Sequence, residues 1–167
     1  MKRLGFSLVE VVIAVGIFSA SIVIVLSLLP SLMRQSSESA HLLIAEKMPD
    51  LIRVALRGES VSMGFSNLAT AIPVMGSPLV NGRVFVATAE GLHIENAVAG
   101  SGGILPNDQF FAVEVWRFDR APLSYDAGAA VLPVYVRVSW PYRVPGMSAP
   151  SKLVDRDQFT FTLALDR

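Results

Sequence analysis

The sequence predicts an α+β fold in which a long N-terminal helix packs on an antiparallel β-sheet. Three features of the 167-residue chain support this prediction. An apolar run covers residues 6–33, an amphipathic helical pattern follows at about 34–57, and strand patterns fill about 80–167. One long helix followed by a series of strands is typical of α+β domains.

The apolar run is long enough to cross a bilayer. A membrane-spanning helix needs about 20 predominantly apolar residues, and Glu10 is the only ionisable residue between Phe6 and Met33. We therefore expect residues 6–33 to form a transmembrane helix in contact with the lipid bilayer.

Basic residues give this helix a direction. Lys2 and Arg3 precede the apolar run, and short positively charged flanks stay on the cytoplasmic side. We expect a single-pass protein of the inner (cytoplasmic) membrane, with a cytoplasmic N-terminus and residues 34–167 forming one extracytoplasmic domain. A segment of that length forms one domain with a modest core.

Glu10 is the unusual residue of the span. A charge at the bilayer centre costs about 2.5 to 3.5 kcal/mol, and less near the interface, so an ionisable residue in a span is a functional candidate. The alternative is that Glu10 extends from the helix end into the headgroups and has no other role.

The segment Gly5-Phe6-Ser7-Leu8-Val9-Glu10, with its short basic leader and apolar helix, resembles the N-terminus of type IV pilins and of type II secretion pseudopilins. The resemblance implies that residues 1–5 are a leader, that a prepilin peptidase cleaves after Gly5 and methylates Phe6, and that Glu10 takes part in filament assembly. It also implies, as partners, other pilin or pseudopilin subunits and an inner-membrane assembly platform. The chain would be a minor pilin or pseudopilin, because it lacks the cysteines of many major pilins.

Physical reasoning gives Glu10 a partner if the leader is removed. Phe6 would then carry a free amine, and a buried carboxylate is tolerated when an opposite charge pairs with it. In a helix bundle, Glu10 of one subunit could pair with this amine of its neighbour. One polar group in an apolar seam can specify the register of a bundle.

A narrower resemblance involves two short phrases. Leu28-Leu-Pro30 and Val138-Ser-Trp-Pro141 are similar to those of the pilin-like Verru-Chthon cassette protein B type. The role of that family is uncharacterised, so this resemblance adds no chemistry.

Two other interpretations of the N-terminus remain open. A secretory signal peptide has an apolar core of about 7 to 15 residues before a small-residue cleavage site, but here the apolar run continues well past the candidate Ser19-Ala20-Ser21. An uncleaved anchor needs only the span and its basic flank. The chain would then be a membrane-anchored extracytoplasmic binding domain, with Gly5 and Glu10 unexplained.

Past the membrane, apolar residues recur at spacings of three and four between residues 34 and 57, as an amphipathic helix requires. Pro30 and Pro49 should each kink or break the helix, because proline lacks the backbone donor and clashes with the preceding turn. Pro49 could instead begin a short helix that ends near Gly58. Residues 59–78 are rich in Ser, Gly and Pro and predict a loop.

Strand patterns fill the rest of the chain. Residues 84–88 and 92–95 predict a short hairpin, while 110–118, 131–140 and 159–165 predict the central strands. The last strand places Phe159, Phe161, Leu163 and Leu165 on one face, which should cover the helix from Leu42 to Leu56.

Nothing in the sequence predicts an enzyme, a cofactor or a nucleic-acid partner. The charge is balanced, with 14 basic and 14 acidic residues, whereas nucleic-acid binding calls for a basic patch. His41 and His93 belong to no metalloprotease or hydrolase motif, and we expect both on the surface. Asp155 and Asp157 could supply oxygen ligands to Ca²⁺, which takes six to eight, but two carboxylates are too few and Arg156 lies between them.

Overall fold

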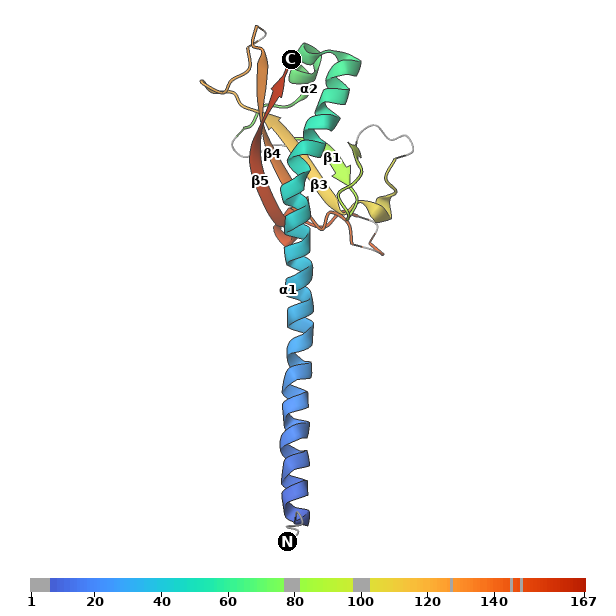
Figure 1. Ribbon diagram of the computed structural model, residues 1–167. Coiled ribbons are helices and arrows are strands. Elements are labelled where there is room, and N and C mark those ends of the chain that lie inside the picture. The colour runs from blue at the N-terminus through green and yellow to red at the C-terminus, as the bar shows by residue number, and fades with distance from the viewer. Residues whose placement is uncertain (1–6, 77–81, 98–102, 127, 145, 148) are drawn as a thin grey trace. The chain divides into compact units, whose positions relative to one another are not determined.

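The computed structural model describes residues 7–76, 82–97, 103–126, 128–144, 146–147 and 149–167. The chain divides into two units, residues 1–40 and 41–167. The first unit is helical where it is described, and the second combines the rest of the same helix with a β-sheet, which confirms the predicted α+β class (Figure 1).

Helix α1 covers Leu8–Met63, 56 residues without a break. The predicted break at Pro49, with a new helix ending near Gly58, is therefore wrong. A proline removes one backbone donor per position, and the adjacent turns keep their hydrogen bonds. The expectation that Pro30 bends the helix stays a prediction.

The loop expected over residues 59–78 is wrong in its first half. Helix α1 runs on to Met63, and helix α2 follows at Phe65–Ala71. Gly64 separates the two helices with a φ of 87°, a left-handed conformation that glycine adopts without steric cost. Helix α2 buries Phe65, Leu68 and Ala69 in the core. Tertiary packing therefore stabilises a helix that the local sequence does not predict.

The sheet has five strands in the order β2-β1-β3-β4-β5, and all neighbours are antiparallel. The strands are β1 at Arg83–Ala87, β2 at Ile94–Asn96, β3 at Phe111–Arg117, β4 at Val131–Trp140 and β5 at Asp157–Asp166. Short 3₁₀ helices at Pro106–Asp108 and Leu153–Asp155 precede β3 and β5. The predicted hairpin and the predicted central strands are confirmed.

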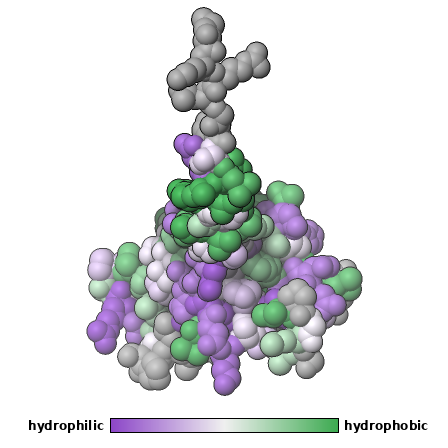
Figure 2. All heavy atoms as spheres, turned by 90° about the horizontal axis from the view of Figure 1, so that it is seen from below, coloured by the Kyte–Doolittle hydropathy of each residue, from purple (hydrophilic) through white to green (hydrophobic). Residues whose placement is uncertain are grey.

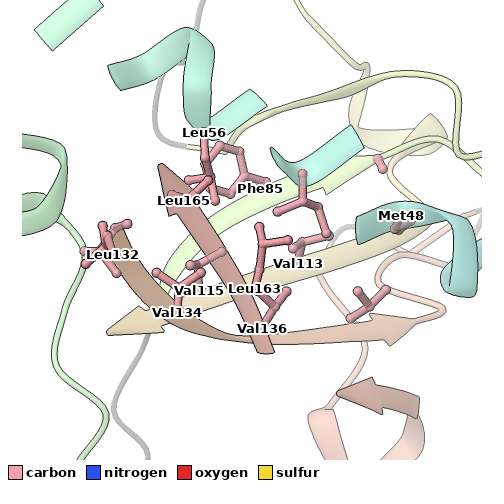
Figure 3. Packing of buried hydrophobic residues seen from close by; sticks show 14 of the residues in the cluster. Met48, Leu56, Phe85, Val113, Val115, Leu132, Val134, Val136, Leu163 and Leu165 are labelled. Carbon is pink, nitrogen blue, oxygen red and sulfur yellow. The ribbon is translucent and has the colours of Figure 1, made fainter. Parts of the chain in front are cut away.

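One face of the sheet packs on the part of α1 that belongs to the second unit. The helix contributes Ala45, Met48, Ile52 and Leu56 to the core, at spacings of three and four that place them on one side. The strands contribute alternate residues, which Figure 3 labels as Phe85, Val113, Val115, Leu132, Val134, Val136, Leu163 and Leu165. The alternation predicted for β5 is confirmed, whereas Leu42 and Leu43 are exposed.

The two ends of the sheet lie at different points along α1. One end, here called the proximal end, is formed by Ala87, Phe111, Trp140 and Asp157, which follow one another across the paired strands. The His41 ring lies 4.6 Å from the ring of Phe110, next to this end. At the opposite, distal end, Arg57 forms an ion pair of 3.3 Å with Asp166.

Candidate functional site at the start of the N-terminal helix

Ser7 and Glu10 organise the first turn of α1. The Glu10 backbone N–H donates to the Ser7 hydroxyl oxygen at 3.3 Å, and the Ser7 carbonyl accepts from the N–H groups of Glu10 and Val11 at 3.1 and 3.2 Å. Serine before a helix with glutamate three residues later is the capping-box sequence. Reasoning from the sequence missed this role, although the spacing Ser7-Leu8-Val9-Glu10 carries the signal.

The position of Glu10 suits a negative charge. The first turn of a helix presents unpaired N–H groups and the positive end of the helix dipole. The Glu10 side chain is exposed and borders a shallow apolar surface formed by Val11, Ala14, Val15 and Phe18. The carboxylate therefore lies at the edge of an apolar helix surface and is available to a partner.

Three serine side chains of the apolar segment form hydrogen bonds within the helix. The hydroxyl groups of Ser21, Ser27 and Ser31 donate to the carbonyl oxygens of Ile17, Ile24 and Leu28, at 2.8, 2.7 and 2.8 Å. Internal bonding of this kind is what a lipid environment demands. In the part of the chain that the structure describes, α1 is the one helix long and apolar enough to span a membrane.

Gly5 and Phe6 lie outside the described residues, so cleavage after Gly5 and methylation of Phe6 stay predictions. Glu10 and Pro30 both lie on α1.

A second polar cluster lies on the sheet face turned away from α1. The carboxylate of Glu114 on β3 accepts from the guanidinium of Arg137 on β4 at 2.7 Å, with side chains 14% and 12% exposed. The Arg137 guanidinium lies 5.0 Å from the ring centroid of Trp116, which is fully buried. A cation over an indole ring is favourable, so this cluster fixes the pairing of β3 with β4.

Arg156 completes the cluster from the segment before β5. Its guanidinium donates to the Ser139 hydroxyl at 3.3 Å and to the carbonyl oxygen of Ser151, and it lies 4.8 Å from the Tyr142 ring centroid. Burial lowers the pKa of Arg156 below its usual value, while Tyr142 and Glu114 act in the opposite direction. An arginine starts from so high a pKa that it remains charged. The contacts of Arg156 therefore tie residues 139–151 together.

The remaining sequence candidates are the two histidines and the two aspartates before and at the start of β5. His41 is half-buried against Phe110, which corrects the expectation that it is solvated, whereas His93 is exposed as expected. Asp155 and Asp157 are exposed on either side of Arg156. Among the described residues, no three His, Cys, Asp or Glu side chains gather as a metal site would require.

Comparisons with known proteins add no identification. No family model, curated protein or solved structure matches the chain.

Proposed function

We propose that this chain is a minor pilin or pseudopilin, a structural subunit that assembles through its N-terminal helix into a filament of the type IV pilus or secretion pseudopilus kind. The observation that carries the proposal is the position of Glu10, an exposed carboxylate in the first turn of a 56-residue helix. The described residues before His41 are all exposed on that helix. Such an apolar surface must be covered by the lipid of a bilayer, by a bundle of similar helices, or first by the bilayer and then by the bundle.

In this proposal the helix first holds the chain in the inner membrane, with residues 34–167 on the far side. A prepilin peptidase removes residues 1–5, and Phe6 becomes a methylated N-terminal amine. Glu10 of an incoming subunit then pairs with the amine of its neighbour. The attraction between these charges in an apolar bundle sets the axial register.

The capping box supports a second candidate, an uncleaved membrane-anchored binding domain. The Ser7 hydroxyl accepts from the Glu10 backbone N–H whether or not a filament exists, and the capping-box sequence by itself gives a reason for a glutamate at this position. The two candidates differ in whether the charge of Glu10 matters, because glutamine replaces glutamate in a capping box.

The first experiment measures the N-terminal mass of the chain coexpressed with a prepilin peptidase, with Gly5→Ala as its control. A mature chain that begins at methylated Phe6, and is lost in the variant, supports the pilin proposal. An intact Met1 in both chains contradicts it and favours the anchor.

The second experiment compares Glu10→Gln with Glu10→Ala in a filament-forming host. If pairing with an amine drives assembly, both variants fail to enter filaments while the leader is still removed. Normal incorporation of Glu10→Gln would show that the capping function suffices and would exclude the proposed role of the charge.

A further inference from the structure

Exposed apolar side chains gather at the proximal end of the second unit. Its loops expose Leu92 at 81%, Leu105 at 67%, Met147 at 61% and Val154 at 84%. We call these four residues the proximal tips. Among the described loop residues at the distal end, Leu123 is exposed at 42%, and the first residue of β4, Val131, at 40%.

Hydrogen bonds join the loops that carry the proximal tips. The Phe110 N–H donates to the Ala87 carbonyl at 2.9 Å, and the Tyr142 N–H donates to the Phe110 carbonyl at 2.6 Å. The Arg143 N–H donates to the Gln109 carbonyl at 3.2 Å. The loops that carry the tips are thus joined by hydrogen bonds at one end of the sheet. Seen from below, hydrophobic and hydrophilic residues are interspersed over the face that Figure 2 shows.

The chain enters the second unit at this same end. His41 contacts Phe110, and a Cβ on Gly91 would lie 2.5 Å from Cγ2 of Ile44, so the start of this unit's helix touches the loops that carry the tips. Only residues 34–40 separate His41 from the apolar run that ends at Met33. Seven helical residues span about 10 Å, and even fully extended they reach about 25 Å.

Along the chain, that short connection keeps His41, and with it the proximal end, within about 25 Å of the end of the apolar run. The headgroup region adds roughly 5 to 7 Å on each side of the hydrocarbon core. Apolar side chains at such a surface gain by entering the interface. A patch of exposed apolar residues commonly marks an interaction site, and here the covering surface that lies within reach is lipid.

Charge does not dominate this surface. Glu90, Asp108 and Asp155 contribute negative charge near the tips, and Arg143 and Lys152 contribute positive charge. The Arg143 guanidinium also donates to the Gln109 side chain at 2.9 Å. Binding of this surface to a membrane would therefore depend on the burial of apolar side chains, and a membrane of neutral lipid should be sufficient for it.

We propose that the proximal tips insert into the interfacial layer of the bilayer that holds residues 8–33, so that the folded domain docks on the membrane surface. The proposal rests on the membrane insertion included in the proposed function. It requires neither leader cleavage nor filament assembly.

The test uses nitroxide labels on the full chain in phosphatidylcholine vesicles. The protein has no cysteine, so Leu105→Cys and Val154→Cys each give one labelled position. Val61→Cys is the matched control, since Val61 is exposed at 88% beyond the distal end. Ile24→Cys reports on the span itself. Collision rates with oxygen, which concentrates in lipid, are compared with those of a water-soluble nickel complex.

We expect the oxygen-to-nickel collision ratio to be severalfold higher at positions 105 and 154 than at 61, approaching the ratio at 24. Equal ratios at 105, 154 and 61, with a lipid value at 24, would overturn docking while leaving membrane insertion intact. A collision ratio at position 24 typical of water would overturn both docking and membrane insertion. Spin–spin broadening at 105 and 154 that grows with protein density would assign the surface to a second copy of the chain and also overturn the proposal.

A second variant tests the same surface without a label on the tips. Leu105→Ser with Val154→Ser, both exposed in the fold, should lower the collision ratio of a label at His93→Cys severalfold while the unfolding temperature stays unchanged. His93 is exposed next to Leu92. An unchanged ratio would contradict docking through these side chains.

Discussion

The guanidinium of Arg83 forms a two-point ion pair with the carboxylate of Glu59, with Nε to Oε2 and Nη2 to Oε1 distances both 2.9 Å. The Asn96 side chain also donates to Glu59 Oε1 at 2.7 Å. This contact joins the last turns of α1 to β1 and β2, at the point where the sequence predicted a loop.

Glu59→Ala should destabilise the folded domain. The two side chains of the ion pair are each 17% exposed, and removal of the acid leaves the Arg83 guanidinium partly buried without this acceptor. We expect a loss of about 2 kcal/mol in the free energy of unfolding, measured by near-ultraviolet circular dichroism of the full chain in detergent.

Asp50→Ala is the control for this measurement. Asp50 pairs with Arg53 at 3.0 Å on the same helix, but its side chain is 86% exposed. Its loss should cost less than about 0.5 kcal/mol. Equal costs for the two variants would mean that the Glu59 pair does not hold α1 to the sheet.

The Glu114–Arg137 ion pair should show coupling between its two side chains. Glu114→Leu alone leaves the Arg137 cation on the sheet without its partner and should cost about 3 kcal/mol. The double variant with Arg137→Leu should regain most of that loss, because a buried ion pair is often replaced by apolar residues at little cost. Thermal unfolding of the single and double variants measures the coupling; additive losses would contradict it.

Periodicity predicted the parts of the fold whose stability depends on one apolar face. The alternation of Phe161, Leu163 and Leu165 predicted β5, and the spacing of Met48, Ile52 and Leu56 predicted the packed part of α1. These patterns can be recognised in the sequence because the burial of each residue follows from its position in the helical or strand period.

Contacts between distant segments could not be predicted in this way. The last turns of α1 depend on Arg83, which is 24 residues from Glu59, and α2 depends on core burial that its short sequence does not reveal. At the candidate site, Glu10 is conspicuous as the one charge in an apolar run, whereas the hydrogen bond from its backbone N–H to Ser7 is signalled only by the spacing of Ser7 and Glu10. The pairing of Arg156 with Tyr142 is likewise a tertiary contact.

Two glycines should respond to alanine in opposite directions. Gly91 has a φ of 65°, and a Cβ there would lie 2.5 Å from Cγ2 of Ile44. Gly91→Ala should therefore cost at least about 1 kcal/mol through strain and displacement of α1.

Gly58 lies inside α1, and a Cβ there would meet no atom within 4 Å. Gly58→Ala should stabilise the fold by roughly 0.5 to 1 kcal/mol, since alanine has the higher helix propensity. Denaturant titration of both variants measures whether the free energy of unfolding falls in Gly91→Ala and rises in Gly58→Ala. Destabilisation by Gly58→Ala would show that residues near Gly58 are not held as regular helix.

The hydroxyl of Ser7 gives the last prediction, on the first turn of α1. Ser7→Ala removes one of the two acceptors of the Glu10 N–H, the hydroxyl oxygen, and keeps the Ser7 carbonyl. Loss of such a cap typically costs about 1 kcal/mol, which corresponds to roughly fivefold faster exchange of that amide. Hydrogen exchange at Glu10, followed by nuclear magnetic resonance in micelles, measures the effect.

Ser21→Ala is the matched control, because the Ser21 hydroxyl bonds back to the Ile17 carbonyl, well away from the cap. Ser7→Thr should restore slow exchange, since threonine also caps helices. If Ser7→Ala leaves the Glu10 amide as slow as Ser21→Ala does, the backbone carbonyl of Ser7 alone holds the turn. That outcome would contradict a capping role for the Ser7 hydroxyl.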